Sequence, residues 1–401
     1  MKIMVCNIGS TSFKFQFLDM KDESVLCRGN VERVGSEKAR IRFYFGKDDL
    51  RVDEERPIPD QGTAVQAGLA FLTAEVIHSL DDIDAVGFKT VQAGEENGSV
   101  LLTDKVLRAM EEYSDLAPAH NPAYLSAIRM FKELMPRKDL VGVFEPGFHT
   151  EKPEYAKVYG APLEWYEKYG VMKYGYHGAS LRYVTGETVR RLHLNPDKHK
   201  VIACHLGGSS SVCAFKDGKS IDTSMGFSAQ SGLIQSTRTG DFDAFAIPFI
   251  MKKKGITMEQ AYRELSSNGG IKGLSGTSGD MRDILDAMEK GSKAAKLARD
   301  KFTYDVKFYM GAYILLMGGV DAVCFTGGIG KKDPELREDV LVSLEFLGFK
   351  LDRAANAANK ERLDAPDSKI AAIVLETNEE LIVARETKKV IEGKESGKVT
   401  E

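Results

Sequence analysis

The stretch MVCNIGSTSFKFQFLD (residues 4–19) has a second version in the same chain, IACHLGGSSSVCAFKDG (residues 202–218). Each begins with an apolar run, passes through a turn of glycine, serine and threonine, and ends in an alternating run that leads to an aspartate. Such a pattern predicts a β-hairpin. Residue 3 aligns with residue 201, an offset of 198 that is far too long for a solenoid repeat. The pair therefore predicts two domains of one design, although hairpins with glycine and serine turns also resemble one another by chance.

Composition indicates an ordinary soluble globular protein. The chain has 401 residues, of which 43% are hydrophobic and 28% charged, enough for two or three domains. The net charge of −4 suggests no nucleic-acid partner and no acidic membrane surface. We find no signal-peptide pattern and no run near the roughly 20 apolar residues that a membrane helix needs, so no membrane partner is expected.

The cysteines point to a reducing compartment. There are five, they are widely spaced, and no two form a CxxC pair: Cys6, Cys27, Cys204, Cys213 and Cys324. An odd number without paired spacing does not fit a disulfide or zinc framework. The expected location is the cytoplasm.

Helical periodicity alternates with short apolar strands, which predicts an α/β fold with a mixed sheet in each domain. Helices are expected over 62–80, over 121–135 with Asn121 as the cap, and over 281–319 with a break near Gly291. Strands are expected at 84–91, 140–145, 321–328 and 370–377. The stretch 46–62 is interpreted as a polar loop, and residues 392–401 as a solvated, disordered end.

Glycine-rich turns follow or join apolar runs at four places: 7–12, 205–211, 269–280 and 325–332. Turns without bulky side chains let backbone N–H groups approach phosphate oxygens, so the set indicates a nucleotide or phosphoryl site. Neither a Walker loop nor a GxGxxG motif opening a helix is present. A nucleotide would have to be bound by another design.

Four polar residues are candidates for the chemistry. Arg238 lies among small residues in STRTGDFD, where it is free to meet a carboxylate or phosphate, and a surface ion pair is the alternative. His177 precedes a predicted helix, where a packed, non-catalytic histidine is common. Glu145 ends a strand, at the edge where α/β folds bind ligands. Glu379 opens a helix, where an acid often only complements the helix dipole.

Taken in order along the chain, the motifs resemble the acetate and propionate kinase family over roughly residues 3 to 393. They are VCNIGSTSFKFQ, APAHNP, FEPGFH, PLEWYEKYGVMKYGYHGAS, HLGGSSSVCAFKDGKSIDTSMGF, STRTGDFD, GLSGTSGDMRDI, FTGGIG and ETNEELIVARET. The resemblance implies a duplicated actin-like, sugar-kinase-like fold with two domains around a cleft. It also implies domain limits of 1–147 plus a C-terminal helix 385–401, and 148–384 for the nucleotide-binding and dimerisation domain.

The resemblance further implies roles for matching residues. Catalytic roles fall on His177, Arg238, Glu145, Lys89 and His120. Nucleotide-binding roles fall on Lys14, Ser10, Ser12, His205, Gly207, Gly208, Ser209, Asp280, Arg282, Gly327, Gly328, Ile329 and Gly330. Asn7 and Glu379 would lie at Mg²⁺, and the acyl pocket would be lined by Lys89, Val91, Ala119, Tyr176 and Ala229.

The chain departs from the family pattern around the active site. Where the family reads GHRVVHGGE, this chain reads GFKTVQAGE, so an arginine is replaced by Lys89 and histidines by Phe88 and Gln92. Lysine keeps the charge and loses the bidentate fork. The family's aspartate is Glu145, one methylene longer, and its phosphate-binding asparagine is Gly208.

The acyl pocket also changes. A leucine becomes Ala119, a phenylalanine becomes Tyr176, a proline becomes Ala229 and a glutamate becomes Ser231. One hypothesis is therefore a carboxylate larger or more polar than acetate, because a methylene changes discrimination by about 1–3 kcal/mol. The other is an acetate or propionate kinase with compensating shifts.

The implied reaction is reversible in-line transfer of the γ-phosphoryl group of ATP to a short-chain carboxylate, giving an acyl phosphate and ADP, with Mg²⁺ bound and water excluded by domain closure. A homodimer paired through the second domain is expected from the resemblance. An alternative of another class is a non-catalytic homologue that binds nucleotide and regulates or scaffolds.

Overall fold

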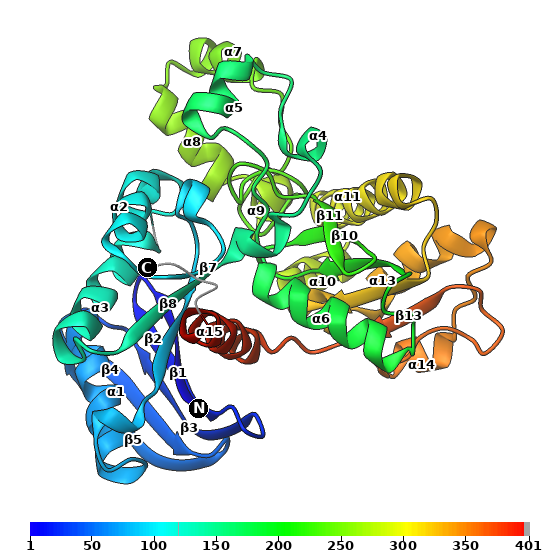
Figure 1. The fold of residues 1–401 in the computed structure, drawn as a ribbon. Coiled ribbons are helices and arrows are strands. Elements are labelled where there is room, and N and C mark those ends of the chain that lie inside the picture. The colour runs from blue at the N-terminus through cyan, green and yellow to red at the C-terminus, as the bar shows by residue number, and fades with distance from the viewer. Residues whose placement is uncertain (119, 397–401) are drawn as a thin grey trace. The chain divides into compact units, whose positions relative to one another are not determined.

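The computed structural model describes residues 1–118 and 120–396, and the chain forms two compact units (Figure 1). The first comprises Met1–Thr150 and the segment that begins at Asn378, and the second is Glu151–Thr377. The observed limits thus lie at 150/151 and 377/378, where 147/148 and 384/385 were expected. The later expected limit falls inside a helix, α15 (Glu379–Glu395), which packs along its length on strands of the first unit.

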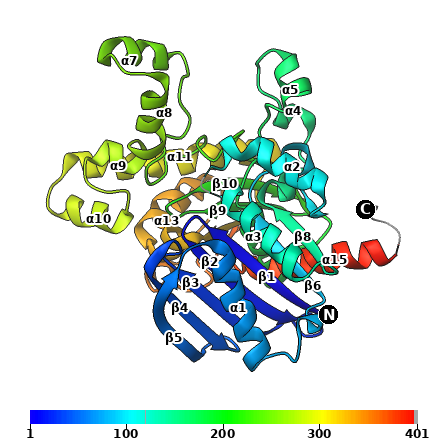
Figure 2. The same cartoon turned by 90° about the vertical axis from the view of Figure 1, so that its left-hand side faces the viewer.

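The first unit contains an eight-stranded mixed sheet in the order β5-β4-β3-β2-β1-β6-β8-β7 (Figure 2). Its strands are β1 (Lys2–Gly9), β2 (Ser12–Asp19), β3 (Ser24–Glu32), β4 (Ser36–Phe45), β5 (Asp49–Ile58), β6 (Ala85–Thr90), β7 (Ser99–Leu101) and β8 (Asp139–Phe144). Strands β1, β6 and β8 run parallel, and β1 to β5 form an antiparallel meander. The parallel strands end at one edge of the sheet, which is where Lys89 and Glu145 lie.

Helices cover both faces of this sheet. The helices other than α15 are α1 (Gln61–Glu75), α2 (Asp104–Glu112) and α3 (Asn121–Leu134). Phe13, Phe15 and Phe17 alternate along β2 and are buried in the core that α1 and α3 share. Helix α15 packs on the opposite face, where Ile3 and Val5 of β1 are buried. Because side chains alternate along a strand, the polar residues of β2 lie on that same face as α15.

The second unit is built on a five-stranded sheet in the order β11-β10-β9-β12-β13. Its strands are β9 (Lys200–His205), β10 (Ser211–Lys216), β11 (Lys219–Thr223), β12 (Ala322–Thr326) and β13 (Ala371–Val374). Helix α6 (Gly178–Arg191) packs on β9 and β12, and the long helix α11 (Lys293–Met317) packs on β9 and β10. The remaining helices are α4 (Glu154–Lys157), α5 (Leu163–Tyr169), α7 (Ala246–Lys254), α8 (Met258–Ser267), α9 (Gly270–Ser275), α10 (Met281–Glu289), α12 (Gly327–Lys332), α13 (Pro334–Leu341) and α14 (Arg353–Ala357).

Both quoted stretches are hairpins, β1–β2 in the first unit and β9–β10 in the second. The predicted strands became β6, β8, β12 and β13, and the predicted helix break near Gly291 separates α10 from α11. One expected helix is shorter: α1 ends at Glu75 because Ser79 caps a separate 3-10 turn, Leu80–Asp82.

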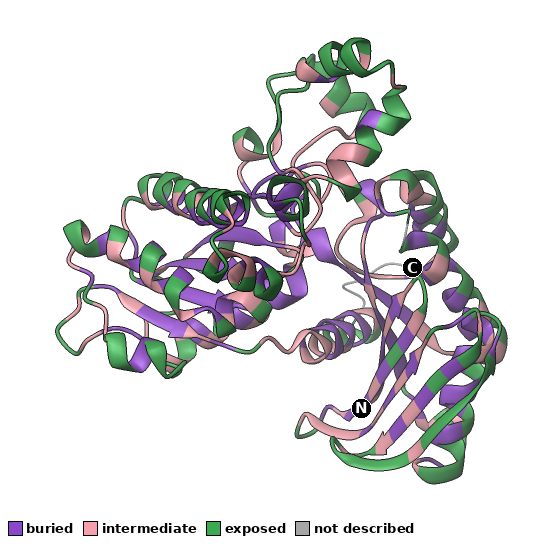
Figure 3. Ribbon diagram, turned by 180° about the vertical axis from the view of Figure 1, so that it is seen from behind, coloured by how far each residue is buried: buried purple, intermediate pink, exposed green. Residues whose placement is uncertain are grey.

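The prediction of a polar loop at 46–62 was wrong. Its centre is β5, an edge strand drawn mostly as exposed in Figure 3, and ion pairs such as Arg40–Asp53 stabilise its pairing with β4. Nearly every side chain of β5 is exposed, so its sequence lacks the alternation of apolar and polar residues from which a strand is predicted. The expected disordered end is also corrected in part, since α15 continues to Glu395; residues 397–401 lie outside the described residues.

Within the described part of the chain, we find no helix both long enough and apolar enough to span a membrane.

Candidate active site

The turn of the first hairpin is small and polar. Ser10 and Thr11 form it, with Gly9 paired opposite Ser12. A Cβ atom on Gly9 would lie 2.6 Å from Ser12 Oγ, so the turn leaves room for the serine hydroxyl only because residue 9 has no side chain. Ser10 is exposed. The turn therefore presents hydroxyl and backbone N–H groups to solvent, which suits an anion.

Asn7 is held in place by a residue that the sequence did not single out. Tyr124, on α3, is 1% exposed, and its hydroxyl donates to Asn7 Oδ1 at 3.4 Å while it accepts from the backbone N–H of Ile8 at 3.0 Å. Burial raises the pKa of Tyr124 above its ordinary value, so the phenol stays a donor. Its only sequence signal is an aromatic at a helical core spacing, which any core tyrosine shares.

Three predicted residues meet at the edge of the first sheet, and we call them the Lys89 cluster: Lys89, Glu145 and Glu379. Lys89 Nζ lies 3.1 Å from Glu145 Oε1 and also donates to Glu379 Oε2. The three side chains are 21%, 9% and 17% exposed. Burial opposes the charge on Lys89, but the two carboxylates outweigh it and hold the pKa of Lys89 above its ordinary value. The lysine is therefore a permanent cation between two acids.

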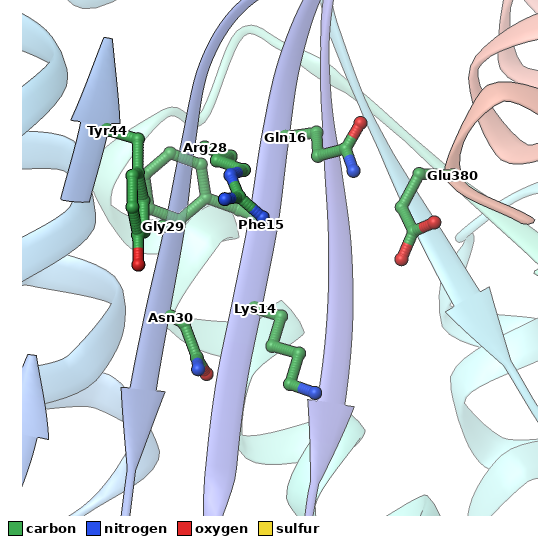
Figure 4. A pocket seen from close by; sticks show the side chains of 8 residues that line it. All are labelled: Lys14, Phe15, Gln16, Arg28, Gly29, Asn30, Tyr44 and Glu380. Atoms are coloured by element: carbon green, nitrogen blue, oxygen red, sulfur yellow. The ribbon is translucent and has the colours of Figure 1, made fainter. Parts of the chain in front are cut away.

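Lys14 lies on β2, opposite Asn7 of β1. It is exposed, and it lines a pocket on the open face of β2 to β4 (Figure 4). The other lining residues are Phe15, Gln16, Arg28, Gly29, Asn30, Tyr44 and Glu380. The Arg28 guanidinium lies 4.2 Å from the centre of the Tyr44 ring. Within the described part of the chain Lys14 makes no hydrogen bond or ion pair, so its ammonium is available to a phosphate.

The two positions where the family pattern has histidines serve packing here. Phe88 is fully buried and meets Phe131 edge to face, with ring centroids 5.3 Å apart. Gln92 is fully buried, and its Oε1 accepts from the backbone N–H groups of Ala93 and Gly94 at 3.0 and 2.9 Å. Asn121 is not the cap of α3, as was expected: it is the first helical residue, and its Nδ2 donates to Gln92 O at 2.9 Å.

His120 takes the cap position of α3 and is exposed. Val91 is half-buried just after β6. Ala119, which was expected to line the acyl pocket, lies outside the described residues.

In the second unit, the β9–β10 turn is organised by hydrogen bonds between its own residues. Gly207 N donates to Ser210 Oγ at 3.0 Å, and that hydroxyl donates to Gly207 O at 2.9 Å. The fully buried Gln235 accepts at Oε1 from Ser209 Oγ and from Ser210 N, at 2.9 and 3.2 Å. Gln235 was not predicted, because one glutamine in a loop carries no pattern. It makes the turn rigid before any ligand arrives.

Arg238 sits against the same turn. Its Nη1 donates to Ser209 Oγ at 3.1 Å, to Gln235 Oε1 at 3.0 Å and to Ala229 O at 3.2 Å. Burial lowers the pKa of Arg238 from its ordinary value, which is so high that the group stays charged. Across the described residues, Nε and Nη2 make no hydrogen bond, so one nitrogen orients the guanidinium and two remain to bind an anion.

His177 and His205 are brought together beside this turn. Their rings stack with centroids 4.1 Å apart. His177 Nδ1 lies 2.9 Å from Ser211 Oγ, and His205 Nδ1 lies 2.8 Å from Ser180 Oγ. His177 has φ 59°, a left-handed conformation that a non-glycine residue adopts at some energetic cost. The two serines therefore fix the orientation of both rings through their Nδ1 atoms.

The two remaining glycine-rich segments are joined to the turn through the backbone. Ile329 N and Gly330 N donate to Leu206 O at 2.9 and 3.1 Å. Ser236 N donates to Gly208 O at 3.1 Å, and Ser236 Oγ donates to Gly279 O, next to Asp280. The second unit thus brings together Gly207, Gly208, Ser209, Gly327, Gly328, Ile329 and Gly330, with Asp280 alongside.

Asp280 caps α10 and binds Arg282. The Arg282 side chain, followed by its backbone N–H, lowers the pKa of Asp280 to about 2. The Arg282 side chain is 88% exposed. This pair is a charged surface feature, accessible to a nucleotide.

The Tyr176 hydroxyl, which was expected to make the acyl pocket more polar, is hydrogen-bonded to the backbone. Tyr176 is 5% exposed, and its hydroxyl donates to Phe227 O at 2.8 Å. Ala229 is half-buried, and its carbonyl accepts from Arg238 and from Gln235 Nε2. The Tyr176 hydroxyl therefore stabilises the loop from 226 to 229. The donor that tyrosine adds relative to phenylalanine is used in a hydrogen bond to the backbone.

Asn7 and Glu379 of the first unit offer oxygen atoms of the kind that a hard divalent cation prefers. Over residues 1–118 and 120–396 there is no group of three or more His, Cys, Asp or Glu side chains placed to hold a metal. Mg²⁺ commonly takes one or two protein oxygens, with phosphates and waters as the rest. Glu379 and Asn7 fit that description.

The Acetokinase family profile matches residues 2–385. The chain is 45% identical over 400 residues to the acetate kinase of Coprothermobacter proteolyticus, covering 98% of this chain and 100% of that one. It is 43% identical to the acetate kinase of Fervidobacterium nodosum, with 98% of both chains covered.

Solved structures agree. A crystal structure of Porphyromonas gingivalis acetate kinase superposes with a TM-score of 0.88 at 36% identity, over 97% of this chain and 99% of that one. A crystal structure of a propionate kinase from Francisella tularensis superposes with a TM-score of 0.88 at 31% identity. This match covers 97% of this chain and 99% of that one. These matches confirm the expected α/β fold with a mixed sheet in each of two domains. A match to the family profile over nearly the whole chain, with relatives above 40% identity, shows that this chain belongs to the acetokinase family.

Proposed function

We propose that this chain is an acetate kinase that transfers the γ-phosphoryl group of ATP reversibly to acetate or propionate. A carboxylate oxygen forms a bond to the γ-phosphorus, the bond from that phosphorus to the β,γ-bridging oxygen breaks, and the products are an acyl phosphate and ADP. The carboxylate is itself the nucleophile, so no covalent enzyme intermediate is needed. The observation that carries the proposal is the preorganised Arg238, held by one nitrogen with two others unbonded, in a chain related to acetate kinases over its whole length.

Each unit supplies groups for this reaction. Arg238 and His177 would neutralise charge on the transferring phosphoryl group, and donors fixed before reaction are worth several kcal/mol. The turns at 206–210 and 327–330 would hold the nucleotide, together with Asp280 and Arg282. In the first unit, Ser10, Ser12 and Lys14 would meet phosphate oxygens.

Mg²⁺ is proposed to bind with the nucleotide, where it neutralises phosphate charge. Glu379 and Asn7 would hold it, and Tyr124 would keep the Asn7 carbonyl oriented.

The tertiary contacts favour acetate or propionate over a more polar acid. Tyr176 was one of the changed positions that led us to expect a more polar pocket, and its hydroxyl is bound to Phe227 O. Removing a proline side chain at Ala229 enlarges the site without adding a polar group. A non-catalytic role is not favoured either, since Arg238 is ordered by Ser209 and His177 by Ser211.

We also propose a homodimer formed through α11. Four large apolar side chains spaced by seven, four and seven residues lie on one face of this helix, each 57–82% exposed: Leu297, Tyr304, Phe308 and Leu315. A contiguous exposed apolar stripe marks an interface. A dimer in light scattering that Leu315→Glu converts to monomer is the expected result. The proposed location is the cytoplasm, where the five buried, free cysteines would stay reduced.

The activity is tested by trapping the acyl phosphate with hydroxylamine, using Mg-ATP and a panel of formate, acetate, propionate, butyrate, lactate and succinate. Acetate or propionate should give the highest kcat/KM. A clear preference for lactate or succinate would contradict the proposed substrate, and no product from any acid while ATP still binds would support a non-catalytic protein.

A further inference from the structure

The Lys89 cluster combines one cation with two acids that come from distant parts of the chain. Lys89 is on β6, Glu145 follows the neighbouring parallel strand β8, and Glu379 opens α15. Because β6 and β8 are in register, with Lys89 opposite Val143, both side chains emerge at the same edge of the sheet. Helix α15 packs on β6 and β8 and brings Glu379 to this edge.

The charge of the cluster does not suit the binding of an anion. Within the cluster itself two carboxylates face one ammonium, and all three side chains are more than three-quarters buried. An ammonium is a compact charge with three donors, and two of its directions point to Glu145 and Glu379. A carboxylate substrate that approached Lys89 would meet these two acids, and repulsion at partial burial is strong.

The two departures from the family pattern also match each other in length. Lysine replaces a longer, forked arginine, and glutamate replaces a shorter aspartate. The extra methylene of Glu145 brings its carboxylate to 3.1 Å from the lysine nitrogen. Either exchange alone would leave a gap or a clash between buried charges, which is destabilising.

We infer that Lys89 is a positioning residue for the carboxylates of Glu145 and Glu379, that it lowers the affinity of this edge for a divalent cation, and that Lys89 and Glu145 are a compensating pair. This inference rests on the proposed function for the identity of the cation, Mg²⁺. It assigns the anchoring of the substrate carboxylate to other groups, among which Arg238 has unbonded nitrogens.

The first test measures metal binding without turnover. Mn²⁺ is titrated into the nucleotide-free chain and followed by electron paramagnetic resonance, with MgCl₂ titrations of thermal unfolding alongside. Lys89→Met should tighten Mn²⁺ binding at least about tenfold, and Glu145→Gln should weaken it by a similar factor, because each changes the charge of the cluster by one. Glu380→Gln is the matched control: it removes one acid beside Glu379 but outside the cluster, and should change binding less than about twofold.

The second test is an exchange cycle that does not depend on Lys89→Met folding. Lys89→Arg and Glu145→Asp should each lower kcat/KM at least about tenfold, and the double variant should return to within about threefold of the natural chain. Additive losses in the cycle would overturn the pairing. Unchanged Mn²⁺ affinity in Lys89→Met, with the KM for acetate raised at constant kcat, would overturn the positioning role and make Lys89 the substrate anchor. If the proposed function itself fails, the natural chain makes no acyl phosphate, whereas the Mn²⁺ measurements still report on the cluster.

Discussion

The imidazole rings of His177 and His205 stack face to face, with centroids 4.1 Å apart and 17° between their planes. Each ring is fixed from behind by a serine hydroxyl, Ser211 for His177 and Ser180 for His205. The stacking and the two hydroxyl contacts together restrict the rotation of both rings.

Ser211→Ala should therefore lower kcat by about tenfold with little change in the KM for ATP, because His177 loses the bond that orients it. Steady-state kinetics of the folded variant checks this. Ser211→Thr keeps the hydroxyl and should recover most of the activity. An equal loss of activity in both variants would mean that Ser211 acts through packing and not by orienting His177.

Arg238→Gln should reduce kcat by about 10² to 10³, the range for removal of a preorganised charge donor, while ATP still binds. Isothermal titration with a non-hydrolysable ATP analogue and the hydroxamate assay measure the two quantities separately. Arg238→Lys should be nearly as inactive, since a compact ammonium lacks the planar guanidinium fork that holds donors in a fixed bidentate geometry. Substantial turnover by either variant would contradict the assignment.

Gly208→Asn should be tolerated and should improve nucleotide binding. A Cβ at this position has only Ser236 Oγ nearby, at 3.9 Å, and the backbone is not in the left-handed region. The added amide would donate to a phosphate as in the family pattern, and a KM for ATP lowered by about threefold or more is expected. Gly208→Ala adds the Cβ without the amide and should leave that KM unchanged.

Gly327→Ala should destabilise the second unit by about 2–4 kcal/mol, measured by urea unfolding. Residue 327 has φ 78°, and a Cβ there would lie 2.4 Å from Leu206 O. Gly328→Ala, at the adjacent residue, is the control. Nothing lies within 4 Å of a Cβ atom there, so the free energy of unfolding should stay within about 0.5 kcal/mol of that of the natural chain. Equal stability of the two variants would show that the turn adjusts freely.

The buried Lys152 should make the free energy of unfolding depend on pH in the alkaline range. It is 3% exposed, its Nζ donates to Lys173 O and Tyr174 O, and burial lowers its pKa from 10.5 to about 8. Between these two values the unfolded chain binds a proton that the folded chain does not, so this group makes stability rise with pH from about 8 to 10.5. The stability difference between the natural chain and Lys152→Met should shift in favour of the natural chain over that window. Parallel curves would show that the ammonium stays charged when folded.

The sequence identified features that depend on neighbours along the chain. Both hairpins, the glycine-rich turns and the alternation of strands with helices follow from local periodicity and from the small residues that tight turns need. The alternation of strands and helices predicted the fold class, whereas most of the candidate residues were named from the resemblance of the motifs to a known family. Strand β5 could not, because an edge strand with charged side chains on both faces lacks the pattern of burial.

Tertiary structure alone decided which of these residues act together. Glu379 is 290 positions from Lys89, and Gln235 and Tyr124 are single polar residues without any local pattern. The sequence showed an arginine exchanged for Lys89 and an aspartate for Glu145 as two separate departures. Their meeting depends on the register of β6 with β8 and on the packing of α15, and long-range packing of this kind cannot be derived from local periodicity.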